Sequence, residues 1–171
     1  MFSAPDLIVA ETLLARLRAR GWRLATAESC TGGLIAALFT EIAGASDVFE
    51  RGFVSYTNAA KIGMLGVDYE LLVRYGAVSG EVARAMAAGA LSASAADIAL
   101  SVTGIAGPGG GSDTKPVGLV HIGLARRGSP AVAHEFRFGD RGRAAVRAAT
   151  VEEALKLLAA AIPSPTTGAE A

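Results

Sequence analysis

The chain has 171 residues, of which 51% are hydrophobic and 19% are charged. This length supports one well-cored domain and is short for two, and the composition excludes a disordered protein. The 16 basic residues balance the 16 acidic ones, which argues against a broad basic surface for non-specific nucleic-acid binding. A single cysteine, Cys30, excludes an intrachain disulfide. Because no secretory signal or apolar run of about 20 residues is recognisable, we expect a cytoplasmic protein that does not span a membrane.

Hydrophobic periodicity predicts an alternation of helices and strands. We expect helices over residues 6–20, 32–43, 58–65, 68–75, 79–95 and 142–162, and strands over 22–27, 48–56, 97–103, 116–126 and 131–138. A tight connector at 127–130 makes the last two strands an antiparallel hairpin. The alternation favours a parallel sheet with helices on both faces, which the hairpin makes mixed. We expect one domain over residues 1–162 and a loose tail over 163–171.

The segment Ala25-Thr-Ala-Glu-Ser-Cys-Thr-Gly-Gly33 is typical of a strand end, a tight glycine turn and a helix start. Such a turn presents a hydroxyl above unpaired backbone N–H groups, which can hold an oxyanion or a phosphate. Ser29 is therefore a candidate nucleophile, and Thr31, Gly32 and Gly33 supply candidate oxyanion donors. The alternative is that Ser29 caps the helix, although Thr31 could be the cap and leave Ser29 for chemistry.

A serine nucleophile needs a base, and Lys61 is the better candidate in this chain. A neutral lysine can take the serine proton if burial lowers its pKa, but Lys61 also fits an ordinary solvated helix lysine. Tyr56 could relay a proton or polarise Ser29, or it could only pack. The histidines, His121 and His134, fall inside predicted strands, so we expect sheet residues there and no Ser-His-Asp triad.

A second glycine-rich loop, Thr103-Gly-Ile-Ala-Gly-Pro-Gly-Gly-Gly-Ser112, follows a predicted strand. It is not a Walker A motif, since Lys115 is not followed by Ser or Thr. Its backbone can approach an anionic ligand, with Thr103 at the strand end where α/β proteins bind ligands; the alternative is a flexible crossover loop. Arg141, at a strand-to-helix junction, could grip a phosphate or be a plain surface arginine. No residues have metal-ligand spacing, so we expect no metal site, and Cys30 is expected to be a buried packing residue.

Five motifs follow one another along the chain. They are Ala27-Glu-Ser-Cys-Thr-Gly-Gly33, Gly52-Phe-Val-Ser-Tyr-Thr-Asn58 with Lys61, Tyr75-Gly-Ala-Val-Ser79, Thr103-Gly-Ile-Ala-Gly-Pro-Gly-Gly110 and Gly139-Asp-Arg141. In this order they resemble the CinA C-terminal domain family, the nicotinamide-nucleotide amidases, over roughly residues 7–160. The resemblance implies a three-layer α/β/α sandwich around a five-stranded mixed sheet.

The resemblance also implies hydrolysis of the carboxamide of nicotinamide mononucleotide to nicotinate mononucleotide and ammonia, in pyridine-nucleotide salvage. Family members use a serine and a lysine without a metal or another cofactor, so Ser29 is the implied nucleophile and Lys61 the implied base, assisted by Tyr56. The implied partner is a small nucleotide and not a nucleic acid or a membrane, and a homo-oligomer stays open. The additional molybdopterin-binding-type domain of larger CinA proteins is not expected here. The positions implied to bind substrate are Thr31, Gly32, Gly33, Asn58, Thr103, Gly104, Gly107 and Arg141.

Two other functions stay open at this point. The same loops could bind a pyridine nucleotide without catalysis and report its level to a partner, although a binding module would not require Ser29, Tyr56 and Lys61 together. A hydrolase of the same chemistry could also act on another amide, such as free nicotinamide.

Overall fold

Helices and strands alternate through residues 2–163, the part of the chain that the structure, a computed structural model, describes. The strands are β1 (Leu24–Glu28), β2 (Phe49–Val54), β3 (Ile98–Gly104), β4 (Leu119–Arg126) and β5 (Val132–Arg137). The helices are α1 (Ala4–Ala19), α2 (Leu34–Thr40), α3 (Asn58–Leu65), α4 (Tyr69–Tyr75), α5 (Gly80–Ser92) and α6 (Arg143–Ala161), with a 3-10 turn, η1 (Ala45–Asp47). Apart from Pro163, the predicted loose tail lies outside the described residues.

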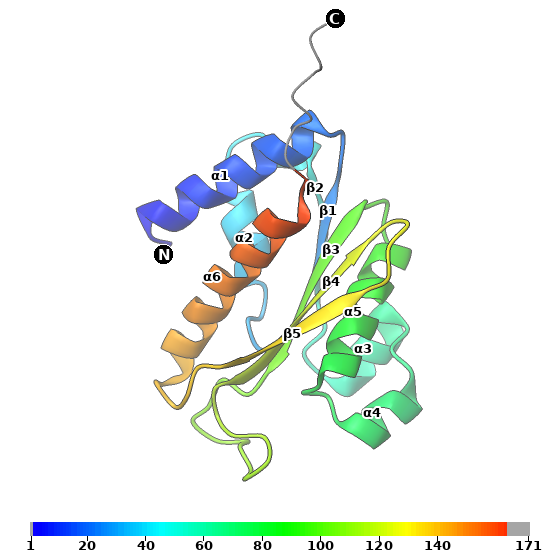
Figure 1. Cartoon of the computed structure of the whole chain (residues 1–171), viewed down its shortest axis with the longest axis vertical. Helices are drawn as coiled ribbons and strands as arrows, with labels where there is room; N and C mark the ends of the chain where they lie inside the picture. Colours follow the sequence, from blue (N-terminus) through cyan, green and yellow to red (C-terminus); the bar gives the residue numbers. More distant parts are fainter. Residues whose placement is uncertain (1, 164–171) are drawn as a thin grey trace, which may run out of the picture.

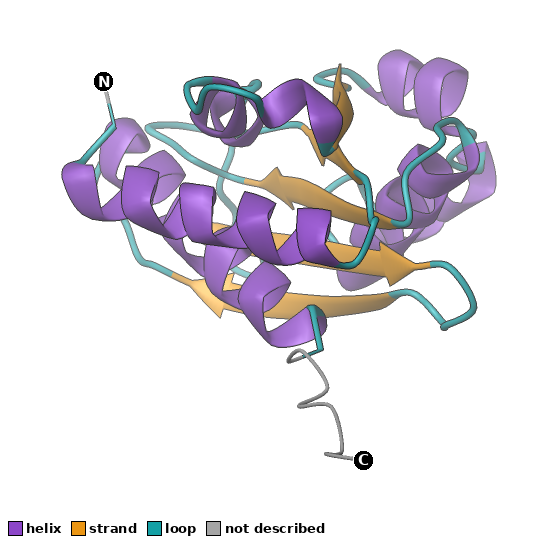
Figure 2. Cartoon of the chain, turned by 90° about the horizontal axis from the view of Figure 1, so that it is seen from above, coloured by secondary structure: helices purple, strands orange, loops and turns teal. Residues whose placement is uncertain are grey.

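The strands form one mixed sheet with the order β2-β1-β3-β4-β5. Strand β1 is parallel to β2 and β3, whereas β4 is antiparallel to β3 and β5. Figure 1 shows α1, α2 and α6 on one face of the sheet and α3, α4 and α5 on the other, and Figure 2 shows these layers from above. The predicted α/β/α sandwich and its terminal hairpin are therefore confirmed.

The predicted elements are all present, and their ends differ from the predicted ones by a few residues. Helix α3 begins and ends as predicted, because Thr57 caps its start by accepting a hydrogen bond from the backbone N–H of Ala60 and Gly66 ends it with a φ of 64°. The predicted cap of α5 is also confirmed, since Ser79 Oγ accepts from the N–H of Val82 at 3.3 Å. Local capping chemistry therefore fixes these boundaries.

The sheet separates two apolar cores of different character. The core beneath α1, α2 and α6 is built from large side chains such as Leu13, Phe39 and Leu100. The core beneath α3, α4 and α5 is smaller and contains many alanines. Small residues let α5 lie close to the sheet there: a Cβ added to Gly123 of β4 would come within 2.3 Å of the carbonyl oxygen of Ala83.

Helices α3 and α5 also approach each other closely, and a glycine makes this possible. A Cβ added to Gly89 of α5 would lie 1.9 Å from the carbonyl oxygen of Leu65, at the end of α3. Lys61 lies one turn earlier on the same helix. The contact at Gly89 therefore helps to fix the helix that carries Lys61.

The carboxyl ends of the three neighbouring strands β1, β2 and β3 meet at one edge of the sheet. Glu28, the last residue of β1, pairs with Val54 of β2 on one side and with Val102 of β3 on the other. Open α/β sheets bind ligands outside these carboxyl ends. The segments that follow the three strands, together with the start of α6, therefore meet in the lower part of Figure 1.

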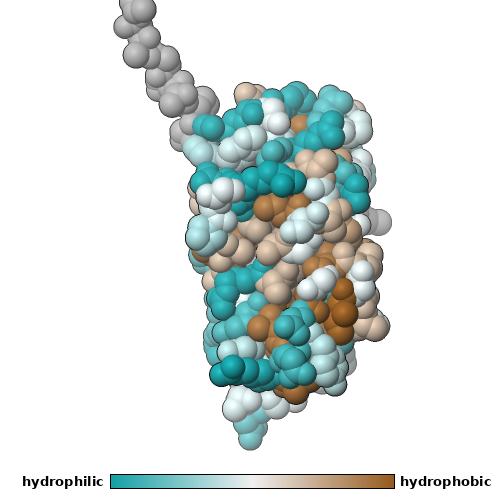
Figure 3. Space-filling model, turned by 90° about the vertical axis from the view of Figure 1, so that its right-hand side faces the viewer, coloured by the Kyte–Doolittle hydropathy of each residue, from teal (hydrophilic) through white to brown (hydrophobic). Residues whose placement is uncertain are grey.

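The outer surfaces of α3 and α4 carry several exposed apolar side chains, namely Ile62, Met64, Tyr69 and Val73. Figure 3 views this side of the molecule and shows hydrophobic patches interrupted by polar residues. These side chains belong to neither of the two cores. Among residues 2–163, none of the helices combines the length and apolar character needed to cross a bilayer.

Candidate active site

The structure brings Ser29 and Lys61 together at the carboxyl edge of the sheet. Ser29 directly follows β1, and Lys61 lies on the first turn of α3. Lys61 Nζ is 3.0 Å from Ser29 Oγ, and only 8% of Ser29 and 2% of Lys61 are exposed. This distance is suitable for transfer of the serine proton to the amine.

Two backbone carbonyl groups orient the amine of Lys61. Its Nζ donates to the carbonyl oxygens of Ser55 at 3.1 Å and Tyr56 at 3.4 Å. In the ammonium form, Lys61 Nζ also donates to Ser29 Oγ; in the neutral form, its two hydrogens would go to these carbonyls and its lone pair would face the Ser29 hydroxyl. Burial lowers the pKa of Lys61 below its ordinary value of 10.5, because desolvation penalises the ammonium form. The alternative of a solvated helix lysine is therefore wrong.

The turn after Ser29 differs from the prediction. Gly33 is the N-cap of α2, with a left-handed φ of 96°, and neither Ser29 nor Thr31 caps the helix. The N–H of Gly32 donates to the carbonyl oxygen of Ser29, and the N–H of Gly33 donates to the Glu28 carboxylate, both at 3.0 Å. Gly32 and Gly33 therefore cannot be free oxyanion donors, and that prediction is wrong.

Two other N–H groups of the same turn are available. Within residues 2–163, the N–H groups of Cys30 and Thr31 donate to no oxygen atom. The Thr31 hydroxyl is also buried without a hydrogen-bond partner among the described residues. Among the three predicted oxyanion donors, Thr31 is thus the one whose N–H donates to no oxygen of residues 2–163, and Cys30 is an additional candidate.

Arg143, in the first turn of α6, connects two loops of the site. Its Nη1 donates to the carbonyl oxygen of Gly107 at 3.0 Å, and its Nη2 donates to the phenol oxygen of Tyr56 at 2.9 Å. The Tyr56 side chain is 56% exposed. Its phenol is bound to Arg143, and the hydrogen bond between Lys61 and Tyr56 goes to the backbone carbonyl of Tyr56. The assistance of Lys61 by the phenol of Tyr56 stays a prediction.

Arg143 and Arg147 are not among the residues that the sequence predicts for the site, whereas Arg141 is. Arg147 Nη2 donates to the carbonyl oxygen of Thr31 at 2.7 Å, so both arginines face the site. Arg141 is exposed, and its side chain makes no hydrogen bond within residues 2–163. The signal that could have found the pair is its spacing of four residues at the start of the last helix, which places both side chains on one helix face.

The other predicted substrate positions lie around the same edge. The Thr103 hydroxyl donates to the carbonyl oxygen of Ala77 at 2.7 Å, which ties the end of β3 to the loop before α5. Gly104 ends β3, and Gly107 accepts the hydrogen bond from Arg143. Asn58 is the exposed first residue of α3. Thr103 therefore has a clear structural partner, whereas Asn58 is open to solvent.

The second glycine-rich loop is anchored by a lysine. Lys115 Nζ donates to the carbonyl oxygens of Tyr75 and Val78, the latter at 2.7 Å. Because Arg143 holds the same loop at Gly107, cationic side chains fix it at both ends. Lys115 thus binds backbone carbonyl groups of the segment before α5.

The histidines lie in the sheet, as predicted, with His121 in β4 and His134 in β5. His121 Nε2 is 3.8 Å from the Glu135 carboxylate, and burial lowers the pKa of His121. Within residues 2–163, neither histidine contacts Ser29, and no three His, Cys, Asp or Glu side chains come together. Among residues 2–163, the side chain that hydrogen-bonds to Ser29 Oγ is that of Lys61.

Cys30 is expected to be unreactive although it adjoins the candidate nucleophile. It is buried, and desolvation raises the pKa of its thiol to about 11, so the thiolate is scarce near neutral pH. Ellman's reagent at pH 7.5 should therefore modify the native protein at a negligible rate and react with one thiol per chain after denaturation in guanidinium. Rapid modification of the native protein would contradict this assignment.

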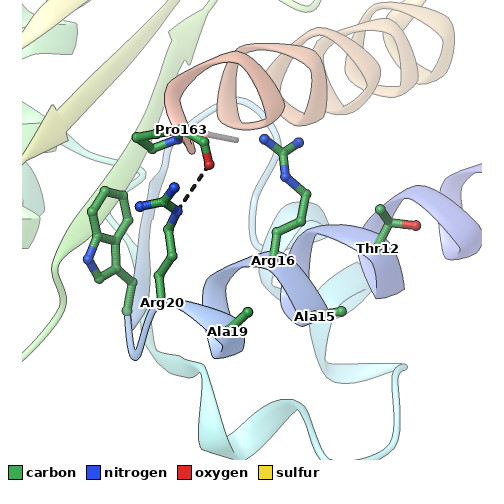
Figure 4. Close-up of a pocket in the computed structure, with 7 residues that line it drawn as sticks. Thr12, Ala15, Arg16, Ala19, Arg20 and Pro163 are labelled. Atoms are coloured by element: carbon green, nitrogen blue, oxygen red, sulfur yellow. Dashed lines mark hydrogen bonds between the residues drawn. The ribbon is translucent and has the colours of Figure 1, made fainter. Parts of the chain in front are cut away.

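A cavity of about 540 Å³ lies at the other end of the sheet. Trp22, which lines it, comes just before β1, whereas Ser29 follows the opposite end of that strand. Figure 4 shows Arg16 and Arg20 of this cavity, with Arg20 donating to the carbonyl oxygen of Pro163. Arg16 donates to the carbonyl oxygens of Ala159 and Ile162, so it caps the end of α6. Arg16 and Arg20 therefore bind α1 to the end of α6 and lie away from the site around Ser29.

Several known proteins are similar to this chain in sequence. The chain is 52% identical to a putative competence-damage inducible protein of Caldicellulosiruptor bescii, over 88% of this chain and 36% of that protein. It is also 52% identical to the nicotinamide-nucleotide amidohydrolase PncC of Enterobacter agglomerans, over 79% of this chain and 83% of that protein. It therefore spans about a third of the Caldicellulosiruptor relative but most of the Enterobacter one.

Solved structures agree with the fold. The competence/damage inducible protein CihA from Agrobacterium tumefaciens superposes with a TM-score of 0.91 at 52% identity, covering 94% of this chain and 97% of that one. A CinA superfamily protein from Klebsiella pneumoniae gives a TM-score of 0.87 at 36% identity, over 92% and 97% of the two chains. The model of the CinA C-terminal domain matches residues 7–162. The chain therefore belongs to the CinA C-terminal domain family.

Proposed function

We propose that the chain is an amidase that hydrolyses nicotinamide mononucleotide to nicotinate mononucleotide and ammonia, without a metal and in the cytoplasm. The observation that carries this proposal is the 3.0 Å contact between Ser29 Oγ and the buried amine of Lys61. The name of the Enterobacter agglomerans relative, a nicotinamide-nucleotide amidohydrolase, supports the choice of substrate.

The reaction proceeds through an acyl-enzyme. Ser29 Oγ attacks the carboxamide carbon while Lys61 accepts the hydroxyl proton. Lys61 then gives this proton to the leaving nitrogen. Ammonia departs, and the acyl group remains on Ser29 as an ester. Lys61 next takes a proton from water, which attacks the ester carbon, and gives this proton to Ser29 Oγ as the C–O bond breaks and the carboxylic acid leaves. One amine thus serves as base and acid in turn, which a lowered pKa favours.

The negative charge that develops on the carboxamide oxygen needs hydrogen-bond donors. The N–H groups of Cys30 and Thr31 supply them in this proposal, because these are the two residues that follow Ser29 and their N–H groups donate to no oxygen of residues 2–163. Removal of a single donor of this kind commonly lowers kcat by about 10²- to 10³-fold. The turn thus contributes both the nucleophile and the groups that stabilise the tetrahedral intermediate.

The phosphate of the nucleotide is bound at the start of α6. Arg143 and Arg147 bring positive charge to the site, and Arg141 is exposed just before this helix. Guanidinium groups and a helix N-terminus both favour phosphate. Binding of this remote group orients the small amide at Ser29. The other predicted substrate contacts are kept as part of the proposal, namely Asn58, Thr103, Gly104 and Gly107.

Ammonia release from nicotinamide mononucleotide in the presence of EDTA tests this function. The wild-type protein should release ammonia, and Ser29→Ala should abolish the release while still binding the nucleotide. Free nicotinamide should react with a kcat/KM about 100-fold lower, because it lacks the ribose phosphate. Nucleotide binding without ammonia release by the wild type would indicate a non-catalytic binding module, and equal turnover of both amides would contradict phosphate recognition.

A further inference from the structure

Glu28 occupies an unusual place for a carboxylate. It is the last residue of β1 and directly precedes Ser29, and its side chain is almost fully buried, with 1% of the residue exposed. Its Oε2 accepts from the N–H groups of Gly33 at 3.0 Å and Ile35 at 3.1 Å, and its Oε1 accepts from the N–H of Ala36 at 2.9 Å. Glu28 therefore binds the start of α2 from the strand that precedes it.

These bonds replace an ordinary helix cap. The first N–H groups of a helix have no partner within the helix, and Ser, Thr, Asp or Asn at the N-cap normally satisfies one of them. Helix α2 has Gly33 at this position and no side-chain cap. A buried carboxylate needs several hydrogen bonds, and the positive end of the helix dipole favours its charge. Because Glu28 meets this need, the Ser29 hydroxyl is not used for capping.

Glu28 also holds the other half of the Ser29–Lys61 pair through its backbone. Its carbonyl oxygen accepts from the N–H of Ser55 at 2.9 Å, and the carbonyl oxygen of Ser55 in turn accepts from Lys61 Nζ at 3.1 Å. Glu28 is thus bonded both to α2, the helix after Ser29, and to Ser55, whose carbonyl group orients the amine of Lys61.

We propose that Glu28 is a positioning residue: its carboxylate fixes the turn between β1 and α2 so that Ser29 Oγ faces Lys61. It thereby occupies the N–H of Gly33, whereas the N–H groups of Cys30 and Thr31 donate to no oxygen atom of residues 2–163. The inference rests on the proposed role of Ser29 as the nucleophile. It assigns to Glu28 no contact with the substrate and no proton transfer.

The substitution Glu28→Gln tests this role, because it keeps the size of the side chain. Both oxygens of Glu28 accept hydrogen bonds from backbone N–H groups of α2 and its cap. In glutamine an NH₂ group replaces one of these oxygens and cannot accept, so at least one of the three hydrogen bonds is lost. We expect kcat to fall about 100-fold, the loss typical of a displacement near 1 Å, whereas KM should change less than about threefold. The rate at which phenylmethylsulfonyl fluoride forms a sulfonyl ester on Ser29, releasing fluoride, should fall in parallel.

Asp97→Asn is the matched control. The Asp97 carboxylate accepts from the N–H of Arg23 at 2.8 Å, beside the opposite end of β1. This variant should lower the melting temperature by a few degrees and leave kcat and the sulfonylation rate unchanged. Both proteins are assayed well below their melting temperatures. A folded Glu28→Gln protein with wild-type kcat and sulfonylation, or an equal loss in Asp97→Asn, would overturn the proposal.

Two further measurements remove the remaining ambiguities. If Glu28→Gln does not fold, Glu28→Asp keeps the charge on a shorter side chain and is measured in the same way. Failure of both variants to fold would make Glu28 a residue of the fold alone and overturn the proposal.

Sulfonylation of Ser29 does not depend on the substrate. If the wild type reacts with the sulfonyl fluoride but not with nicotinamide mononucleotide, the proposed substrate is wrong, while the role of Glu28 is still decided by the ratio of sulfonylation rates.

Discussion

Replacement of Lys61 by methionine is expected to lower the rate of amide hydrolysis by about 10²- to 10⁴-fold, the usual contribution of a general acid–base. The methionine side chain fills a similar volume but cannot accept the proton of Ser29 Oγ, which lies 3.0 Å from the amine in the wild type. The fold should survive: the carbonyl groups of Ser55 and Tyr56 lose a donor, but the cost of burying an amine disappears. Ammonia release, together with thermal unfolding followed by circular dichroism, measures both effects.

The pH dependence of the wild type should report the same amine. Burial lowers the pKa of Lys61 below 10.5, so the neutral form that accepts the proton becomes populated at a lower pH than for an exposed lysine. We therefore expect kcat/KM to rise with pH and to level off below pH 10.5, and this rise should be absent from the residual activity of Lys61→Met. Because burial disfavours the ammonium form, Lys61 lowers the free energy of unfolding. This effect is largest at pH values below the pKa of Lys61 in the folded state, where the amine is protonated.

Lys156→Met provides the matched control, because Lys156 is an exposed lysine on α6 whose amine binds only Glu153 among residues 2–163. It should leave both kcat and the pH profile unchanged. Substantial activity in Lys61→Met, or an unchanged pH profile in that variant, would show that Lys61 is not the base.

Gly89→Ala is expected to destabilise the protein, although alanine normally stabilises a helix. The added methyl group would lie 1.9 Å from the carbonyl oxygen of Leu65, and backbone atoms on both sides cannot move aside without shifting α3 against α5. Overpacking of this kind costs about 3 kcal/mol at the upper end of its usual range, which corresponds to a fall of about 10 °C in melting temperature. Activity should fall as well, because α3 carries Lys61.

Gly63→Ala distinguishes this contact from helix propensity. Gly63 lies in α3, and a Cβ at this position would meet no atom within 4 Å. Alanine should therefore stabilise the protein by about 0.5–1 kcal/mol. Chemical denaturation of both variants gives the two free energies of unfolding, and equal shifts of the same sign would contradict the close contact between α3 and α5.

The parts of the site that could be predicted from the sequence are those set by local chemistry. Ser29 lies in a strand–turn–helix pattern, and Lys61 lies in a short helix whose boundaries Thr57 and Gly66 define. Both residues could be selected before their contact was known. The layers and the hairpin could also be predicted, because they follow from the order of periodic segments and from a short connector.

The hydrogen-bond partners could not be predicted, because they depend on how distant segments meet. The phenol of Tyr56 binds Arg143, which is far away in the chain. The N–H of Gly33 is occupied by Glu28, a charged residue inside an otherwise buried strand. That charge was a usable signal: a carboxylate in a fully buried strand requires donors, and the nearest unpaired ones are at the start of the next helix.

The amine of Lys61 is held by backbone carbonyl groups, so its orientation does not depend on the side chains of the residues that carry them. Substitution of the side chain at position 55 or 56 leaves both carbonyl acceptors in place. The Tyr56 side chain, exposed and bound to Arg143, can therefore be varied without removing either anchor of the base. A library confined to the side chain at position 56 would therefore change the surface beside Arg143 while both backbone acceptors of the Lys61 amine stay in place.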